Sequence, residues 1–504
     1  MSGFTVALAL VMLYGCGLYA LAAAAVCTAF LVRILSRFGV DPVISFTLSG
    51  LASLLLLLPL LDAFRGITLP PKGISVNRED APGLWSLVDQ SAAALGGPTP
   101  DTILIDNDTN LGMWTQDRRG NKQRTLVVGA PLLAMLSVGQ IRALSTWPLS
   151  FEPRYQKWPR NHVHLGHLGL RRALQRFYRQ PWNPMGLLLL PGIAAYFAVS
   201  TKVTRAGMFA TDRDAARLAG GENSRTALRE IPALDRIWES FQERHLKPGI
   251  AFHLMPSDVL GGFIGYCETR AADLAEYRDN LPTGKPPWGS THPTFAERVA
   301  ALEGVEGEPR PGDEAPASVL VDRFGQFAAQ ADLMRADHTV KRIPWETWEE
   351  RVAREKHSAR AAAAYRSLER LLGPERSGLE ALIAEVESND RDRLFLALDE
   401  KGFPAGGLDS ILILAALDSK ALRIETRWGE APAYIGADGR PFDLEALRAP
   451  LFAAEPDPRR FRELLAERGV DLTLAVPVAT VSLRRKTCNT TRTRGIFTQT
   501  RASW

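Results

Sequence analysis

The feature that most restricts how this 504-residue chain can fold is an uncharged apolar run, FTVALALVMLYGCGLYALAAAAVCTAFLV, at residues 4–32. About 20 apolar residues in a helix already cross the hydrocarbon core of a bilayer. A cleaved secretory signal would have a charged segment followed by a shorter apolar stretch, and neither is present. The sequence therefore predicts a membrane-spanning helix.

A second apolar run extends from Val43 to Leu61, so residues 1–66 are expected to form the transmembrane hairpin of a multi-pass protein of the cell membrane. A third run, MGLLLLPGIAAYFAVST at residues 185–201, is shorter and contains Pro191. It is compatible with crossing the membrane, re-entering it or lying in a core. Basic residues flank the spans too evenly to assign a side of the membrane.

Composition argues against two classes of protein. The four cysteines show neither metal nor disulfide spacing, so a disulfide-stapled fold is not expected. The net charge of +4 is small for this length, and outside residues 154–179 the basic side chains are dispersed. A nucleic-acid partner is therefore not expected, whereas the apolar runs predict the membrane as a partner.

The remaining patterns are mainly helical with a few short strands. Residues 81–96 have apolar residues at helical spacing, whereas DTILID at 101–106 and RTLVVG at 124–129 alternate like strands. The segment between the two strands is expected to be a hairpin-type connection, and GGFIG at 261–265 a flexible loop. These patterns predict a mainly helical α+β fold.

Towards the C-terminus, three segments are distinguished by composition. Residues 305–317 combine Pro, Gly and acidic residues and are expected to be a linker. Residues 318–480 are highly charged with helical periodicity and predict a helical C-terminal region. Residues 481–504 lack periodicity and are expected to be a disordered tail.

One helix has a well-defined start, because Ser137 and Gln140 fit a capping box. The order of segments around it is a membrane hairpin, LWSLVDQSAAALG, TLVVGAPLLAMLSVGQIRAL, an apolar run, TRAGMFATDRDAARLAGG and STHPTFAERVAALEG. This order resembles the HtpX and CAAX prenyl protease family of membrane zinc metallopeptidases over residues 1–304. The resemblance implies a zincin-like peptidase domain at residues 67–304, a zinc cofactor, and a peptide or membrane-protein substrate.

In that family, a helix carries the motif H-E-x-x-H. Its two histidines lie one turn apart on the same face and bind Zn²⁺, and its glutamate is the general base for a metal-bound water. A later helix supplies E-x-x-x-D, in which the glutamate is the third ligand and the aspartate orients a ligand histidine.

The resemblance places Thr146 and Ser150 at the histidine positions, Trp147 at the glutamate, Met208 at the third ligand and Asp212 at the retained aspartate. Hydroxyls are poor zinc ligands, methionine prefers softer metals, and tryptophan cannot act as a base. The zinc site is therefore expected to be degenerate, and no zinc is expected to be bound.

Pro148 lies inside the same helix, where a proline costs about 3 kcal/mol. Either the chain has truly diverged, or residues 145–184 reflect a shifted reading frame. Met208 favours divergence, because it lies beyond this segment in a stretch that is otherwise in register.

Some family positions are retained. Asp212, His292 and Arg298 are the candidate catalytic residues, with Asp212 expected to have become an ion-pair partner or a relic. A weaker alternative is a replacement metal site made of three histidines, His162, His164 and His167.

Three functions follow from these patterns. The first is a membrane-anchored, catalytically inactive member of the family that binds peptides or client proteins. The second is an active zinc endopeptidase that cleaves membrane proteins with unusual ligands, or with ligands that a sequence error hides. The third is a structural membrane protein in which the former cleft is filled.

Overall fold

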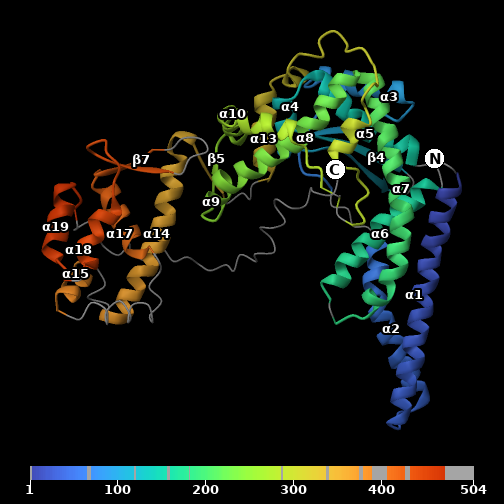
Figure 1. The fold of residues 1–504 in the computed structure, drawn as a ribbon, viewed down its shortest axis with the longest axis horizontal. Helices are drawn as coiled ribbons and strands as arrows, with labels where there is room; N and C mark the ends of the chain where they lie inside the picture. The colour runs from blue at the N-terminus through green and yellow to red at the C-terminus, as the bar shows by residue number, and fades with distance from the viewer. Residues whose placement is uncertain are drawn as a thin grey trace. The chain divides into compact units, whose positions relative to one another are not determined.

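The chain is described by a computed structural model (Figure 1), which covers residues 3–64, 70–118, 121–155, 159–180, 182–284, 286, 288–335, 340–373, 379–388, 406–425, 432–453 and 455–471. These residues form two compact units. Unit 1 comprises residues 3–237 and 272–335, and unit 2 comprises residues 238–271 and 340–471. Helices dominate both units and short strands occur in each, so the predicted mainly helical α+β class is confirmed.

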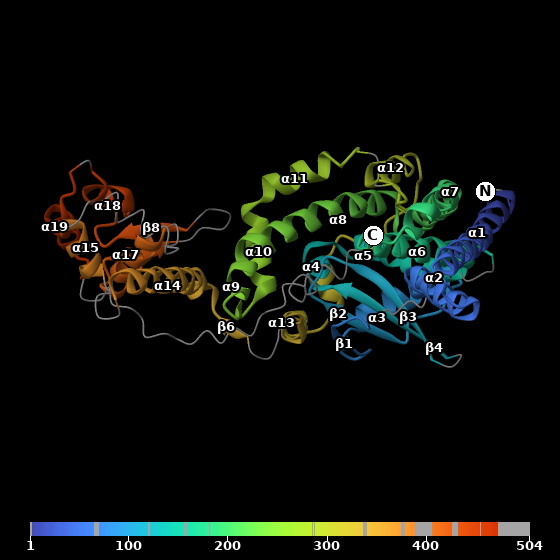
Figure 2. The same ribbon diagram turned by 90° about the horizontal axis from the view of Figure 1, so that it is seen from below.

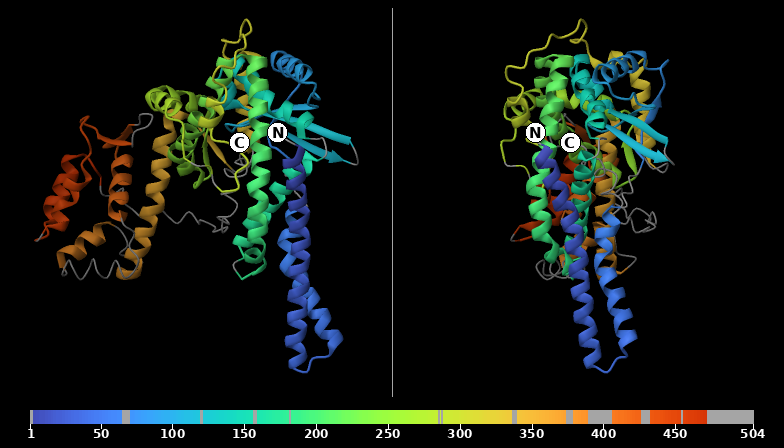
Figure 3. Two further views of the ribbon diagram at one scale, coloured as in Figure 1. Left: turned by 45° about the vertical axis from the view of Figure 1, so that its right-hand side comes forward. Right: turned by 90° about the vertical axis from the view of Figure 1, so that its right-hand side faces the viewer.

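Four helices of unit 1 lie alongside one another (Figure 3): α1 (Gly3–Arg37), α2 (Pro42–Phe64), α6 (Arg160–Tyr178) and α7 (Met185–Ala219). Small residues let these helices approach closely. A Cβ atom on Gly166 of α6 would lie 2.5 Å from the Leu13 side chain of α1 and 2.9 Å from the hydroxyl of Tyr196 in α7. That hydroxyl donates a hydrogen bond of 2.6 Å to the carbonyl of Val163, which ties α7 to α6.

The α1–α2 hairpin has polar residues inside and apolar residues outside. Ser45, Ser49 and Ser53 recur every four residues along α2 and are buried, and the hydroxyl of Thr28 in α1 donates a 2.8 Å hydrogen bond to the Ser53 hydroxyl. The exposed surface is formed by large apolar side chains, among them Phe4, Val11, Leu18, Val26, Phe30, Val43, Phe46 and Leu51. Of the described helices, α1 and α7 are long and apolar enough to cross a membrane, and α2 contains a shorter apolar stretch over Pro42–Leu58.

The rest of unit 1 is built around a four-stranded sheet (Figure 2) with the order β1–β2–β4–β3. Its strands are β1 (Ile74–Val76), β2 (Thr102–Asp106), β3 (Leu111–Arg118) and β4 (Asn121–Gly129). The two predicted strands are confirmed as β2 and β4, which pair in parallel. The segment between them is not merely a connection, because β3 pairs antiparallel with β4 and forms an edge of the sheet.

Three helices contact this sheet: α3 (Pro82–Leu95), α4 (Ala130–Met135) and α5 (Val138–Tyr155). The predicted capping box at the start of α5 is confirmed. The backbone N–H of Ser137 donates to Gln140 Oε1 at 2.9 Å, and the backbone N–H of Gln140 donates to Ser137 Oγ at 3.3 Å. Helix α5 continues through Pro148 despite the missing backbone donor at that position.

Unit 1 also contains most of α8 (Gly221–Phe241), which continues into unit 2, together with α11 (Ala271–Asp279), α12 (Phe295–Ala300), the 3₁₀ turn η2 (Ala317–Leu320) and α13 (Phe324–Arg335). The expected linker, residues 305–317, instead packs within this unit. The N–H groups of Val138 and Gly139 in the first turn of α5 donate to the carbonyls of Ala315 and Asp313, both at 2.9 Å. The segment therefore caps α5, because the first N–H groups of a helix have no partner within the helix.

Unit 2 contains a π-helical turn, η1 (Gln242–Leu246), followed by α9 (Lys247–Ile250), β5 (Leu254–Pro256), α10 (Val259–Thr269), β6 (Lys341–Ile343), α14 (Trp345–Leu372), α15 (Leu379–Ser388), α17 (Gly407–Asp418), β7 (Leu422–Glu425), β8 (Ala433–Gly436), α18 (Leu444–Phe452) and α19 (Pro458–Glu467). Strands β5 and β6 pair in parallel, and β7 and β8 pair antiparallel. One core of this unit is formed by apolar side chains of α14, α15, α17, α18 and α19, including Leu368, Ile383, Leu412 and Phe461.

The boundaries of the predicted C-terminal helical region, 318–480, differ from those of unit 2. Residues 318–335 belong to unit 1, whereas residues 238–271, expected within the peptidase domain, belong to unit 2. The expected flexible loop at 261–265 lies inside α10, where Asp258 caps the helix by accepting a 2.8 Å hydrogen bond from the Gly261 N–H. Residues 472–504, which include the expected disordered tail, lie outside the described residues.

Candidate functional site

The positions where the family resemblance would place zinc are buried on α5 and α7. Thr146 and Ser150 on α5 are 0% and 3% exposed, and Met208 on α7 is 7% exposed. The two helices that carry these positions pack against each other.

Hydrogen bonding in this interface is local and does not form a metal-binding arrangement. The hydroxyl of Thr146 donates to the carbonyl of Arg142 at 3.0 Å, one turn earlier in α5. The hydroxyl of Ser150 lies 3.3 Å from the hydroxyl of Thr211 in α7, which itself donates to the Gly207 carbonyl at 3.1 Å. The hydroxyls therefore form hydrogen bonds with one another and with backbone carbonyls of their own helices. Side chains of these types do not fit a zinc site.

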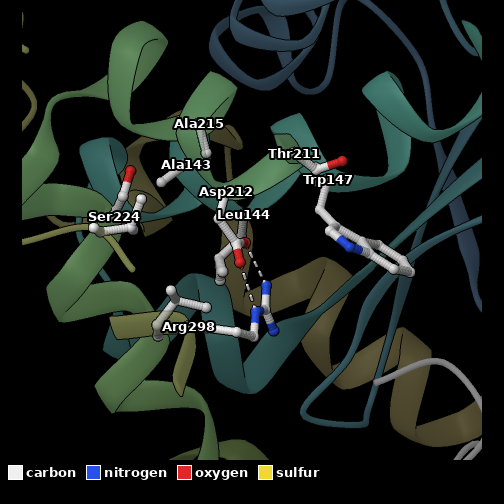
Figure 4. Close-up of a pocket in the computed structure, with 10 residues that line it drawn as sticks. Ala143, Leu144, Trp147, Thr211, Asp212, Ala215, Ser224 and Arg298 are labelled. Carbon is white, nitrogen blue, oxygen red and sulfur yellow. Dashed lines mark hydrogen bonds and ion pairs between the residues drawn. The ribbon is translucent and has the colours of Figure 1, made fainter. Parts of the chain in front are cut away.

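Two of the retained residues, Asp212 and Arg298, form a buried ion pair (Figure 4). Arg298 Nε donates to Asp212 Oδ2 at 3.0 Å, and Arg298 Nη2 donates to Asp212 Oδ1 at 2.7 Å. The side chains are 6% and 5% exposed, so this two-bond contact is shielded from water. The expectation that Asp212 would be an ion-pair partner is confirmed, and its partner is another retained residue.

Arg298 is positioned by the start of α12. Thr294 caps this helix, accepting a 3.1 Å hydrogen bond from the Glu297 N–H, while Glu297 Oε2 accepts a 2.7 Å hydrogen bond from the Thr294 N–H. This reciprocal capping box fixes the first turn of the helix. Arg298 lies in this turn of α12, and its guanidinium contacts Asp212 of α7.

The cavity next to this ion pair is very small. Its volume is about 20 Å³, and it is lined by Ala143, Leu144, Trp147, Thr211, Asp212, Ala215, Ser224, Leu228, Arg298 and Leu302 (Figure 4). A cavity of about 10–15 Å³ already holds one water molecule, so this one has room for a water but not for a peptide. Trp147, which the resemblance places at the glutamate position, forms part of the wall.

His292, the third retained residue, lies close to this cavity but does not contact the ion pair through a described hydrogen bond. Its ring is 6.4 Å from that of Trp147, centre to centre, and its Nδ1 lies 2.9 Å from the Thr291 hydroxyl. Burial, reinforced by the charge of Arg298, lowers the pKa of His292 to about 4. His292 is therefore neutral at pH 7.

The three histidines of the alternative metal site do not converge. His162 is exposed, His164 is half-buried and His167 is fully buried on α6. His167 Nε2 lies 2.8 Å from the Gly289 carbonyl and must donate to it, so Nδ1 accepts the 2.7 Å hydrogen bond from the Ser200 hydroxyl. Both ring nitrogens are occupied, and His167 has a structural role between α6, α7 and the 289 loop.

Across the part of the chain that the structure describes, no group of three or more His, Cys, Asp or Glu side chains is placed to hold a metal ion. Comparisons of this chain with models of known protein families, with curated proteins and with solved structures return no match.

Sequence reasoning missed one polar network beside the site. Asp313 Oδ1 accepts a 3.2 Å hydrogen bond from Arg142 Nε of α5, and Asp313 Oδ2 accepts one of 3.3 Å from the Asn223 side chain of α8. The Asp313 side chain is 2% exposed and that of Arg142 is 10% exposed. Asp313 stands among glycines and prolines that predict a solvated linker, and no local signal indicates its partner, which is 171 residues away.

Proposed function

We propose that this chain is a membrane-anchored, diverged member of the HtpX and CAAX prenyl protease family that does not hydrolyse peptides and instead binds extended polypeptide segments of membrane proteins. The observation that supports the loss of hydrolysis is the packed α5–α7 interface. At the four family positions, Thr146, Trp147, Ser150 and Met208 offer neither the usual ligands nor a base, and Arg298 already engages the retained Asp212.

The proposed cell-membrane location, with several crossings, is supported by how polarity is arranged in the α1–α2 hairpin. Water-soluble helices bury apolar residues and expose polar ones. Here Ser45, Ser49 and Ser53 are buried, whereas Phe30 and Phe46 are 64% and 65% exposed. Small polar residues between helices and apolar residues facing outward are typical of helix pairs in lipid.

True divergence, as opposed to a shifted reading frame, is supported by the fit of α6 to its neighbours. Its apolar residues Val163, Leu170, Ala173 and Phe177 recur at helical spacing and are buried. Gly166 lies where a side chain would collide with Leu13. Mass spectrometry of peptides from the native protein tests this: divergence predicts peptides with the sequence of residues 145–184 as printed, and HELGH-type peptides would contradict it.

The proposed binding surface is the outer edge of β3. The Gly129 N–H donates to the Asn110 carbonyl at 2.8 Å, so these two residues form a hydrogen-bonded pair of the antiparallel ladder. Hydrogen-bonded and non-hydrogen-bonded pairs alternate along such a ladder. The pair Leu111 and Val128 is therefore not hydrogen-bonded, nor is the pair Thr115 and Arg124, and the backbone N–H of Thr115 points away from β4. A row of such groups can pair with an extended peptide.

The loss of the zinc site is tested by metal analysis of the full-length protein purified in detergent. We expect far less than one zinc per molecule and no casein cleavage that a chelator abolishes. The matched variant combines Thr146→His, Trp147→Glu, Ser150→His and Met208→Glu, and it should gain stoichiometric zinc if the scaffold is zincin-like. Zinc bound by the natural protein would overturn the loss of the site, and a folded variant without zinc would count against the family assignment.

Peptide binding is tested with a matched pair at Thr115, which is exposed on the edge strand. Thr115→Pro removes one outward N–H without removing a bond to β4, and Thr115→Val keeps it. The proposal predicts that capture of extended, apolar peptides falls in the proline variant only. If the natural protein captures no such peptide, the structural role is favoured instead.

A further inference from the structure

The turn between α6 and α7 presents large apolar and aromatic side chains beside basic ones. Tyr178 is 90% exposed, Trp182 is 68% exposed and Leu187 is 76% exposed. Arg172 and Arg179 are exposed on the same part of the hairpin. Tryptophan and tyrosine with arginine are the side chains enriched where a membrane surface meets water.

The depth of this turn can be measured against the α1–α2 hairpin. The side-chain amide of Asn183, in the turn, donates a 3.1 Å hydrogen bond to the carbonyl of Leu56 in α2. About 15 residues, or about 22 Å of helix rise, separate Leu56 from Asp41 at the α1–α2 turn. Figure 3 shows the same difference, with the α6–α7 turn ending far short of the α1–α2 turn in both views.

The composition of α6 excludes a crossing by that helix. Arg171, Arg172 and Arg176 lie in its second half, and a charge at the centre of a bilayer is costly. The apolar part of α7 lies beside the first half of α1, where a Cβ atom on Gly192 would be 3.4 Å from Cys16 Sγ. Helices α6 and α7 therefore approach the membrane from the side on which the sheet of unit 1 lies.

We propose that the α6–α7 hairpin is re-entrant: its turn inserts into the boundary between headgroups and acyl chains on the sheet side and does not cross. This inference rests on the proposed anchoring of α1–α2 in the membrane. The turn is continuous with the apolar surface of that hairpin, since Asn183 bonds to α2. Arg172 lies about 10 Å along α6 from Arg179, so it reaches the headgroups while Trp182 lies among the upper acyl carbons.

The test uses the full chain in sealed vesicles of phosphatidylcholine and phosphatidylglycerol, with the four native cysteines replaced. Single cysteines are introduced by Phe38→Cys at the α1–α2 turn, Glu79→Cys near β1, Trp182→Cys at the α6–α7 turn and Leu51→Cys in the middle of α2. All four side chains are exposed. A membrane-impermeant maleimide is added to either side of the vesicles, and the rate of labelling is measured for each position. A nitroxide attached at residue 182 or 51 reports the depth of that residue in the bilayer.

The expected result is that positions 38 and 79 are labelled from opposite sides. Position 182 should react in detergent but only slowly from either side of the vesicle, with a nitroxide depth shallower than that at position 51. Labelling of position 182 from the same side as position 38 would overturn the proposal in favour of a crossing. Equal reactivity of position 182 in vesicles and in detergent would place the turn in water. Labelling of positions 38 and 79 from one side would instead refute the anchoring on which the inference rests.

Discussion

At the scale of single residues, Asp212 and Arg298, two residues that the resemblance implies to be catalytic, form a buried ion pair. In the family pattern the aspartate orients a histidine, but here position 146 is a threonine that bonds to its own helix. The carboxylate instead receives two hydrogen bonds from a guanidinium that is itself buried. A buried pair of this kind fixes geometry, because each charge is costly without the other.

The first prediction concerns this pair. Arg298→Met leaves the Asp212 carboxylate buried without its cation, and we expect a loss of about 3–5 kcal/mol in the free energy of unfolding. Asp212→Leu combined with Arg298→Met removes both charges and should recover most of that loss. Thermal unfolding of the purified variants by circular dichroism measures both effects. Asp212→Leu alone completes the cycle: if the double variant loses as much free energy of unfolding as the two single variants lose in sum, the two residues are not coupled.

The second prediction concerns pH and His357 in unit 2. The Ser410 hydroxyl donates to the Gly406 carbonyl at 2.8 Å, so His357 Nδ1 donates to the Ser410 oxygen at 3.1 Å and Nε2 accepts from the Tyr434 hydroxyl at 2.8 Å. This arrangement requires neutral imidazole. Burial, with Lys356 and Arg360 nearby, lowers the pKa of His357 to about 4.

Because the folded-state pKa lies below the usual value of about 6.5, acidification favours the unfolded chain. The stability contributed by neutral His357 is complete above pH 6.5 and is lost progressively between pH 6.5 and about 4. We expect the melting temperature of unit 2 to fall over this interval and His357→Gln to flatten the slope. His292→Gln, in unit 1, is the matched control, and an unchanged slope for unit 2 in His357→Gln would contradict the assignment.

At the scale of helices and strands, the largest correction concerns residues 305–317, which cap α5. Asp313 accepts hydrogen bonds from Arg142, Asn223 and the backbone N–H of Arg310, the last at 2.9 Å. We therefore expect a glutamate-specific protease to cut slowly after Glu306 and Glu314 in the natural protein and much faster in Asp313→Ala. Rapid cutting of the natural protein at these positions would restore the linker interpretation.

The elements that sequence predicted correctly are those whose signals are local. The apolar runs, the capping box at Ser137 and the strands β2 and β4 each depend on spacing within a few residues. Strand β3 was missed because its pairing with β4 is decided by the sheet, and α10 was missed because the glycines of 261–265 suggest a loop. Gly262 lies against the Trp345 ring, where a Cβ atom would be 2.6 Å from Nε1, and only the tertiary structure reveals this use of glycine.

The candidate site was predictable in part for the same reason. The resemblance pointed to positions on α5 and α7, two helices that pack against each other, and the residue types at those positions already lack the usual zinc ligands. The ion pair joins Asp212 to a residue 86 positions away, and one hydrogen bond of His167 joins it to a residue 122 positions away. No spacing rule relates residues that far apart in sequence.

At the scale of the whole molecule, the chain is divided into two units whose cores use different residues. In unit 1, Leu126 of β4 is fully buried in the sheet, and in unit 2, Leu412 of α17 is 1% exposed in the helical core. Chains with more than one core commonly do not unfold in a single all-or-none step. We therefore expect calorimetry of the full-length protein to show two transitions.

The matched variants Leu126→Ala and Leu412→Ala assign these transitions. Each removes the same buried atoms and should cost its own unit about 2–5 kcal/mol. Leu126→Ala is expected to lower only the transition that also responds to Arg298→Met, because those residues belong to unit 1. Leu412→Ala should lower only the transition whose pH dependence His357→Gln flattens, because both residues belong to unit 2. If either variant shifts both transitions equally, the units unfold together, and the division of the molecule does not describe its folding.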